Sequence, residues 1–512
     1  MLEATEHHCL WRDEALALRK VVAEQAETIA EQAQVIAEQG RIIADHEQKI
    51  DAVLAQMQAL ERRILGPKSE KMPSPAKELR RQETDAEAEA RRHAALERRR
   101  ERAALREKLR QETVTHHVTD EQADCPKCGG VTERPVGGGK ATSLYEYVPG
   151  YFVRQNHVQE KLACDCGEYI ATADPPPRPI EKGHYGPGFI AHIVVMKCSD
   201  SIPLYRLAKQ YERLGIAMSR STLTDLFHAA ANILEPLYKR LLALVAASPI
   251  VQADETSLKM QRPAKRGFVW TFLADELIAY RFAGDRSGAT PLEVLGGTEG
   301  TLVVDGYTGY NRVTDVDGRT RAGCIAHVRR KFFDAMMSGV AEAKVALDLI
   351  LDVYRVEHEV RARHIVRSDE HLNLRQTRSR AAMDRLRTWL FDQQGRYPPK
   401  SPMGEAVRYA LNQWNALTTF LDDARVPVDN NASERALRVV ALGRKNFLFV
   451  GDEEGGANLA GLYSLVATCD VAGVDPTEYL KNVLMRVDTH PASRIDELLP
   501  QNWQPPLRIF VD

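Results

Sequence analysis

Hydrophobic and polar positions repeat every seven residues near the beginning of the chain. The repeat reads AEQAETI, AEQAQVI, AEQGRII and ADHEQKI over residues 23–50. Apolar positions spaced alternately by three and four residues are typical of the seam of a coiled coil. The seam consists of Ala26, Ile29, Ala33, Ile36, Gly40, Ile43, Glu47, Ile50, Leu54 and Met57. The pattern predicts an oligomerisation helix within residues 1–65, weakened by its small residues and by Glu47; the alternative is an amphipathic helix packed on its own protein.

Two short β-rich runs further along the chain each end in an aspartate. Residues 248–254 (SPIVQAD) end at Asp254, and residues 301–305 (TLVVD) end at Asp305. Each run predicts a buried strand with its acid at the C-terminal end, where open α/β sheets place ligands. A helix between the two strands would make them parallel neighbours and would bring the two acids together.

Two further strands are predicted between these acids. Residues 267–274 (GFVWTFLA) and 277–283 (LIAYRFA) are joined by Asp275 and Glu276, which is typical of a tight hairpin. Glu255 follows Asp254 directly, but neighbouring side chains of a strand point to opposite faces. The sequence therefore excludes Glu255 from a site that contains Asp254.

A helix that begins near residues 429–431 supplies a third acid, Glu434. Asp429, Asn430 and Asn431 are favourable N-cap residues, so Glu434 lies in the first turns. A solvated pair with Arg438 at i+4 is the alternative. Three carboxylates at one edge repel one another unless a cation joins them, and oxygen ligands select Mg²⁺ or Mn²⁺. Two such ions activate a hydroxyl and stabilise the leaving oxygen of a phosphodiester, so the pattern predicts in-line phosphoryl transfer.

Basic residues surround the predicted carboxylate site. A strand at residues 324–326 leads into a helix that His327 opens, and His327 is either a packed helix residue or a residue at the mouth of the site. In the second case it would position the scissile phosphate together with neighbouring cations. These cations are Arg329, Arg330 and Lys331. A second basic cluster suited to DNA phosphates consists of Arg435, Arg438, Arg444 and Lys445.

Four cysteines predict a structural zinc ion in a small β-rich domain over residues 116–175. They are Cys125, Cys128, Cys164 and Cys166. Two close pairs of thiolates, each followed by Gly, are typical of the two knuckles of a tetrahedral site, although the second pair is CxC rather than CxxC. A buried or disulfide-linked quartet is the alternative.

Two other regions offer DNA contacts. Residues 66–115 contain a linker and a highly charged helix, which is either a solvated helix or an arm that contacts phosphates. Residues 180–247 contain a helix, a tight turn and a second helix up to residue 230, followed by an apolar helix at 234–247. The spacing suits a helix-turn-helix with Arg220 facing a major groove, and ordinary helix-hairpin packing explains it equally well.

Composition agrees with a multidomain protein. The chain has 512 residues, of which 44% are hydrophobic, and a formal net charge of −2. A charge near zero argues against a uniformly cationic coat, so DNA contacts must come from local basic patches. There is no apolar run long enough to span a membrane and no signal-peptide pattern at the N-terminus, so we expect a cytoplasmic, nucleoid-associated protein.

Six blocks, in order along almost the whole chain, resemble the transposases of the insertion-sequence-66 family. The blocks are residues 202–215 (IPLYRLAKQYERLG), 253–256 (ADET), 303–312 (VVDGYTGYNR), 324–334 (CIAHVRRKFFD), 429–438 (DNNASERALR) and 443–451 (GRKNFLFVG). The resemblance implies a DDE transposase whose α/β RNase H-like catalytic core spans residues 248–470. In it, Asp254, Asp305 and Glu434 would hold two Mg²⁺ or Mn²⁺ ions.

The expected architecture therefore combines this core with an N-terminal coiled coil, a zinc ribbon and further helices. Residues 335–425 form a helical insertion, and residues 471–512 form a helical cap. The expected partners are transposon ends, target DNA, other copies of the chain and accessory proteins of the same element. Two alternatives remain open, namely a DNA-binding assembly or regulatory factor with an inactive core, and a nuclease that only hydrolyses DNA.

Overall fold

The computed structural model describes residues 10–65, 74–80, 85–107, 150–163, 170–314 and 318–505. Internal contacts divide the chain into two compact units. The larger unit comprises Met1–Met72, Arg178–Leu204 and Thr224–Asp512, and the smaller comprises Pro73–Pro177 and Tyr205–Leu223.

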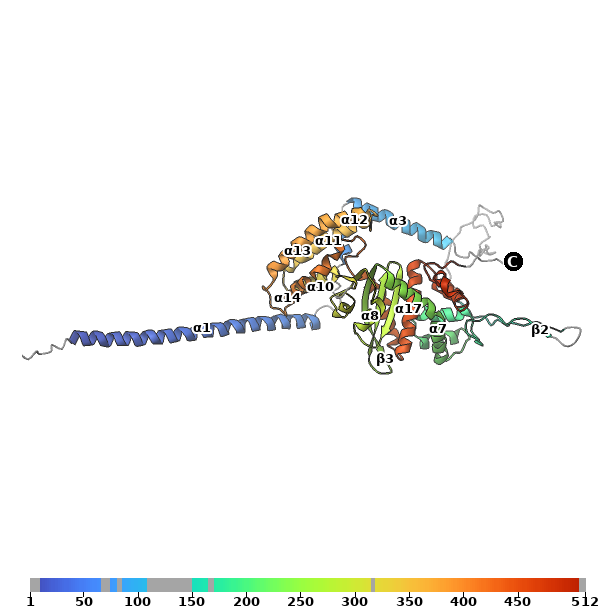
Figure 1. Cartoon of the computed structure of the whole chain (residues 1–512), viewed down its shortest axis with the longest axis horizontal. Helices are drawn as coiled ribbons and strands as arrows, with labels where there is room; N and C mark the ends of the chain where they lie inside the picture. The colour runs from blue at the N-terminus through green and yellow to red at the C-terminus, as the bar shows by residue number, and fades with distance from the viewer. Residues whose placement is uncertain are drawn as a thin grey trace, which may run out of the picture. The chain divides into compact units, whose positions relative to one another are not determined.

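A mixed sheet of six strands lies in the larger unit (Figure 1). Its strands are β3 (Ile250–Met260), β4 (Arg266–Ala274), β5 (Leu277–Ala283), β6 (Thr301–Val303), β7 (Thr320–Ala322) and β8 (Phe449–Val450). The first three form an antiparallel meander, whereas β6 runs parallel to β3 and β7 parallel to β6. The order is thus β5-β4-β3-β6-β7, and β8 pairs with the C-terminal end of β3. The expected hairpin and the parallel neighbour of β3 are both present.

Helix α17 (Glu453–Ala472) protects the edge of this sheet. Its Ser464 hydroxyl accepts a hydrogen bond from the backbone N–H of Tyr280 on β5, at 2.8 Å. The Thr468 hydroxyl accepts from the N–H of Ile278 at 3.2 Å and donates to its carbonyl at 3.1 Å. Because the backbone groups of the outer strand find partners here, β5 is not an exposed edge open to pairing with another chain.

Helices occupy most of the chain between β7 and β8. They are α10 (Ile325–Met337), α11 (Ala343–Ala362), α12 (Asp369–Leu374), α13 (Arg380–Gln393), α14 (Pro402–Asn412), α15 (Trp414–Thr418) and α16 (Asn431–Phe447). α10 packs against α11 and α14, and α11 packs against α13 (Figure 1). Their apolar faces share one core, which includes Val328, Ile350 and Leu386.

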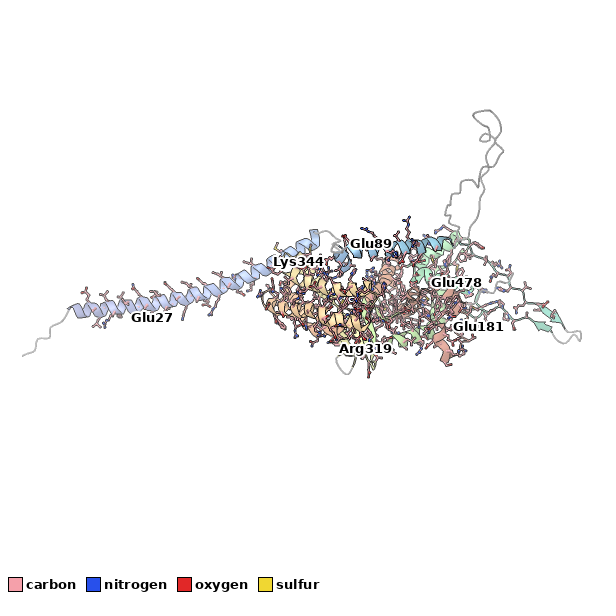
Figure 2. The ribbon with its side chains drawn as sticks, turned by 90° about the horizontal axis from the view of Figure 1, so that it is seen from above. Glu27, Glu89, Glu181, Arg319, Lys344 and Glu478 are labelled. Carbon is pink, nitrogen blue, oxygen red and sulfur yellow. The ribbon has the colours of Figure 1, made fainter. Side chains whose placement is uncertain are left out.

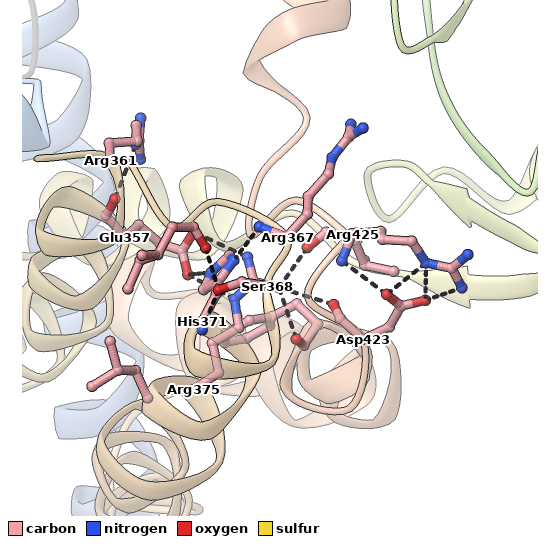
Figure 3. Close-up of polar contacts among 12 residues, drawn as sticks. Glu357, Arg361, Arg367, Ser368, His371, Arg375, Asp423 and Arg425 are labelled. Atoms are coloured by element: carbon pink, nitrogen blue, oxygen red, sulfur yellow. Dashed lines mark hydrogen bonds and ion pairs between the residues drawn. The ribbon is translucent and has the colours of Figure 1, made fainter. Parts of the chain in front are cut away.

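A buried polar cluster lies among these helices, around a π-helical turn at Arg375–Ser379 (Figure 3). Arg375 is 2% exposed and donates to both carboxylate oxygens of Glu357, at 2.8 and 3.0 Å. The Nδ1 atom of His371 accepts from the N–H of Arg367, so Nε2 carries the proton that faces Glu357 at 3.3 Å. The buried charge of Arg375 is therefore paired, as a buried charge must be.

The N-terminal repeat forms one helix, α1 (Leu10–Leu65). Its described side chains are exposed, and Figure 2 shows them projecting from the helix, with Glu27 labelled. The seam residues Ile29, Ile36 and Ile43 are 65%, 68% and 58% exposed. The helix is thus as predicted, while its pairing with another copy stays a prediction.

The described part of the smaller unit contains helices and a pair of short strands. They are α2 (Pro75–Arg80), α3 (Asp85–Glu107), the paired strands β1 (Lys161–Ala163) and β2 (Ile170–Thr172), and most of α6 (Leu204–Arg213). Across the described residues of both units, we find no helix that combines the length and the apolar character needed to cross a bilayer.

Three element boundaries differ from the sequence-based expectation. β3 continues past Asp254 because β4 pairs with it as far as Lys259. The strand expected at residues 324–326 lies at Thr320–Ala322, and α10 already begins at Ile325. The helices expected before residue 230 and after residue 234 form one helix, α7 (Arg220–Ala247), which contains Pro236.

Candidate active site

The register of two parallel strands brings Asp254 and Asp305 to the same level of the sheet. Gln252 of β3 pairs with Val303 of β6. Two residues further along each chain segment stand Asp254 and Asp305. An oxygen of Asp254 accepts from the N–H of Glu255 at 2.8 Å, and an oxygen of Asp305 accepts from the N–H of Tyr307 at 2.9 Å. These bonds orient both carboxylates through one oxygen of each.

Asn430 brings the start of α16, and with it Glu434, to the same strand. The side-chain amide of Asn430 donates to the carbonyl of Ala253 at 2.7 Å, next to Asp254. Its own carbonyl oxygen accepts from the hydroxyl of Ser433 at 2.7 Å. Glu434 lies in the first turn of α16, as its position after the N-cap residues predicted. This buried amide therefore couples the start of the helix that carries Glu434 to the strand of Asp254.

The loop that carries Asp305 is also held in place. Arg321 of β7 donates to the backbone carbonyls of Asp305 and Tyr307, at 2.6 and 2.9 Å. A Cβ on Gly306 would lie 2.6 Å from the ring of Tyr409, so only glycine fits between this loop and α14. Gly306 thus serves close packing in this structure.

The three acids influence one another electrostatically. Burial raises the pKa of Asp254 to about 7, and the negative charges of Glu255, Asp305 and Glu434 act in the same direction. The backbone N–H of Glu255 opposes this rise. The ionised form of Asp254 is consequently destabilised, and a bound cation would stabilise it.

The donor set fits a hard divalent cation. Carboxylate oxygens are the ligands that Mg²⁺ and Mn²⁺ take in proteins, and the charges of Glu255, Asp305 and Glu434 add to the effect of burial on Asp254. Within the described ranges, no three His, Cys, Asp or Glu side chains stand close enough to hold one ion together. Shared coordination by Asp254, Asp305 and Glu434 therefore stays a prediction.

His327 lies beside the third acid. As the third residue of α10, it places Nε2 3.9 Å from a carboxylate oxygen of Glu434, and the two side chains are 33% and 39% exposed. His327 thus lies next to Glu434, and its role at the mouth of the site stays a prediction. Arg330, three residues further, is exposed.

The predicted basic residues have different surroundings. Arg435, Arg438 and Lys445 are exposed on α16, and their spacing of three and seven residues places them on one face of the helix. Arg444 instead donates to the carbonyl of Ser257 at 2.7 Å and to the Thr256 hydroxyl at 3.1 Å, so it ties α16 to β3.

Arg329 departs from its predicted role as a DNA contact. It is only 1% exposed in α10, because its position on the helix faces the core that Val328 and Phe332 also enter. A guanidinium at this depth does not reach a DNA phosphate at the surface. Arg220, in contrast, is exposed as the first residue of α7.

Sequence reasoning missed the partners of Glu255. Glu255 accepts hydrogen bonds from Arg286 Nε and from the Tyr310 hydroxyl, each at 2.7 Å. The Arg286 guanidinium also stacks over the ring of Tyr307 at 4.1 Å. The carboxylate of Glu255 is thus engaged by two side chains, and its exclusion from the acid site stays a prediction. The glycines and tyrosines of residues 306–310 were the signal that this loop packs closely.

The four cysteines predicted to bind zinc lie outside the described residues, which end at Ala163 and resume at Ile170 around the second pair. Strands β1 and β2 flank that second pair in the chain. The cysteines that the structure describes are Cys198, Cys324 and Cys469, all buried and unpaired by disulfides.

Comparisons with known proteins identify the family of this chain. The family model described as "Transposase IS66 family" matches residues 182–458, which include all three acids. The "IS66 C-terminal element" matches residues 464–501, and the "zinc-finger binding domain of transposase IS66" matches residues 122–167, which include the four cysteines.

Three relatives from Sinorhizobium fredii (strain NBRC 101917 / NGR234) match over long stretches. The uncharacterized protein y4jD is 32% identical over 410 residues, covering 76% of this chain and 79% of the relative. The uncharacterized proteins y4hP and y4qI are 31% and 34% identical over 415 and 402 residues. These matches cover 76% and 74% of this chain and 74% of each relative. The protein belongs to the IS66 family of transposases.

Proposed function

We propose that this transposase cleaves DNA at the ends of an insertion sequence and joins those ends to target DNA in a metal-dependent reaction. Asp254, Asp305 and Glu434 are the residues that would hold two Mg²⁺ or Mn²⁺ ions. When bound, such ions supply the Lewis acidity that activates a hydroxyl nucleophile and stabilises the leaving oxygen of a phosphodiester.

One observation carries this proposal. The Asn430–Ala253 hydrogen bond joins the helix of Glu434 to the strand of Asp254, across 177 residues of sequence. Together with the parallel register of β3 and β6, it supports a site to which three distant segments each contribute one acid. This topology supports an RNase H-like core in which the helical insertion separates the second acid from the third.

Residues around the acids would bind the DNA backbone. His327 beside Glu434 is suited to orient the scissile phosphate, because its imidazole can donate to a phosphate oxygen. The exposed cations Arg330, Arg435, Arg438 and Lys445 would contact phosphates further along the strand. Arg444 would act indirectly by holding α16 on β3.

A cleavage and strand-transfer assay tests the proposal. The substrate is a labelled duplex from the end of the insertion sequence that carries this gene, in the presence of Mg²⁺. We expect cleaved and joined products from the natural protein. The variants Asp254→Asn, Asp305→Asn and Glu434→Gln should each lose activity by a factor of 10³ or more, since each removes a charged oxygen ligand. Asp488→Asn, which changes an exposed acid at residue 488, is the matched control.

The outcomes separate the alternatives. Retained activity in any of the three acid variants would contradict the assignment of that residue. Cleavage without joined products would identify a nuclease, and DNA binding without cleavage would identify a regulatory factor with an inactive core.

Two other parts of the chain complete the proposed transposase. The helix α1 would join copies of the chain through its exposed seam, since transposition requires two DNA ends to be held together. A zinc ion held by Cys125, Cys128, Cys164 and Cys166 would stabilise the domain that the zinc-finger family model matches.

A further inference from the structure

We propose that the helical insertion positions Glu434, and that Tyr354 and Arg375 are the positioning residues through which it does so. This inference rests on the proposed metal-dependent function. It concerns the short segment from Phe420 to Asn430, which connects the insertion to the helix of Glu434.

Arg375 holds the first half of this segment. Its Nη1 atom donates to the backbone carbonyls of Phe420, Asp423 and Val426, at 3.0, 2.9 and 2.8 Å. The same guanidinium also donates to the carboxylate of Glu357 on α11, which is 7% exposed (Figure 3). One buried cation thus gathers three carbonyls of an irregular turn that would otherwise need other donors.

Tyr354 holds the second half. Its hydroxyl donates to a carboxylate oxygen of Asp429 at 2.9 Å. Tyr354 and Glu357 are three residues apart on α11 and therefore lie on one face of that helix. The single helix α11 consequently fixes the segment at two points, Val426 through Arg375 and Asp429 directly.

The next residues, Val428 to Asn430, connect the segment to α10 and β3 by hydrogen bonds. The carbonyl of Val428 accepts from the N–H of Ile325 at 3.1 Å, and the N–H of Asn430 donates to the Cys324 sulfur at 3.2 Å. Asn430 then bonds to Ala253 beside Asp254, and Glu434 follows one turn later. The position of Glu434 relative to Asp254 is therefore set jointly by the sheet and by α11.

A simple stabilising role does not explain the choice of residues. A buried ion pair contributes little more to stability than well-packed apolar side chains would, whereas a fully bonded polar network specifies one arrangement. The π-helical turn that presents Arg375 points the same way, since such turns are frequent at functional sites.

The test uses the full-length protein and Mn²⁺ binding, with Tyr354→Phe as the main variant. This change removes the hydrogen bond to Asp429 and keeps the ring. We expect Mn²⁺ affinity to fall on the order of fivefold, with a similar fall in kcat and an unchanged KM for DNA. Tyr397→Phe, on a partly buried tyrosine of the same insertion, is the matched control and should change neither quantity.

A double-mutant cycle distinguishes positioning from general destabilisation. In a Glu434→Gln background, Tyr354→Phe should have almost no further effect on Mn²⁺ affinity, because the group that it positions is gone. An equal loss in both backgrounds, or no loss in the first, would overturn the proposal. Arg375→Lys, which keeps the charge but loses the planar set of donors, should show the same dependence on Glu434.

Hydrogen exchange gives a readout that does not depend on metal. Tyr354→Phe should speed amide exchange at residues 429–436 and leave α13 unchanged. Absence of this local change would contradict the proposed link. The natural protein could bind no Mn²⁺ while Tyr354→Phe still speeds exchange at residues 429–436. The proposed metal-dependent function would then fail, while the link from Tyr354 to the helix of Glu434 would stand.

Discussion

Adjacent acids of β3 have opposite surroundings. Asp254 lies near other acids, and its own pKa is raised. Glu255 instead accepts hydrogen bonds from Arg286 and Tyr310. The charge of Glu255 still acts on Asp254, but its own oxygens accept hydrogen bonds from other side chains. At the scale of single residues, the partners of a carboxylate therefore decide whether it is available to a cation.

His371 gives a prediction on the effect of pH on stability. Burial lowers the pKa of its imidazole below the ordinary value of 6.5, and the nearby Arg375 acts in the same direction. The unfolded chain therefore binds the proton more readily than the folded one. The contribution of neutral His371 is complete above about pH 6.5 and is lost as the pH falls through the lowered pKa.

We expect the urea midpoint of the natural protein to fall between pH 7.5 and pH 5.5, and to fall less in His371→Gln. The urea midpoint is plotted against pH for both proteins, and the difference between the two slopes gives the contribution of His371 apart from the other titrating groups. Parallel slopes would show that His371 does not contribute. Glu357 acts only at lower pH: burial raises its pKa, but Arg375 brings it below the ordinary value.

At the scale of elements, the N-terminal end of α16 is joined to β3 by the Asn430 amide, while Arg444 ties the other end of the helix to the same strand. Asn430→Asp keeps the size of the side chain but cannot donate to the carbonyl of Ala253, so two oxygens would face each other. We expect a loss of about 1–3 kcal/mol in the free energy of unfolding. DNA cleavage should fall as well, because the start of the helix that carries Glu434 loses its bond to the strand of Asp254.

Asn431→Asp, at the neighbouring and less buried position, serves as the comparison. Chemical denaturation and the cleavage assay check both variants. Equal stability and activity of the two would show that the amide does not hold the junction.

Elements with a clear periodicity could be predicted from the sequence, whereas their junctions could not. The β5 strand and the start of α16 matched because alternation and N-cap residues are local signals. β3 was cut short because Glu255, Thr256 and Ser257 break the apolar pattern. Pairing with Trp270 and Val269 on β4 keeps these residues in the strand, and no local pattern reports that pairing.

The candidate site follows the same rule. Each acid was proposed from its own segment, but the contacts that place the start of α16 reach residues far away in the sequence, Ala253 and Tyr354. Asn430 was recognised only as an N-cap, and Tyr354 was not recognised at all. Burial of Arg329 was also missed, because a basic stretch gives no indication of which side chain faces the core.

At the scale of the whole molecule, the exposed seam of α1 predicts self-association. Ile36→Asp combined with Ile43→Asp places charges in the seam and should lower the molecular mass measured by sedimentation equilibrium. Val35→Asp combined with Ile42→Asp alters exposed apolar residues one position away. Equal masses for both double variants would contradict pairing through the seam.

The zinc site gives a second prediction at this scale. We expect one zinc ion per chain by elemental analysis of the full-length protein, and its loss in Cys125→Ala and in Cys164→Ala. Cys469→Ala, which changes a buried cysteine of α17, should retain the metal. Full zinc content in the first two variants would assign the ion to other ligands.

The central claim is that Asp254, Asp305 and Glu434 share divalent cations. Mn²⁺ binding by the full-length, zinc-loaded protein, followed by electron paramagnetic resonance, tests it most directly. We expect saturable binding that weakens at least tenfold in each of Asp254→Asn, Asp305→Asn and Glu434→Gln, and that stays unchanged in Asp488→Asn. Equal affinity in the natural protein and in any of the three acid variants would contradict a shared site.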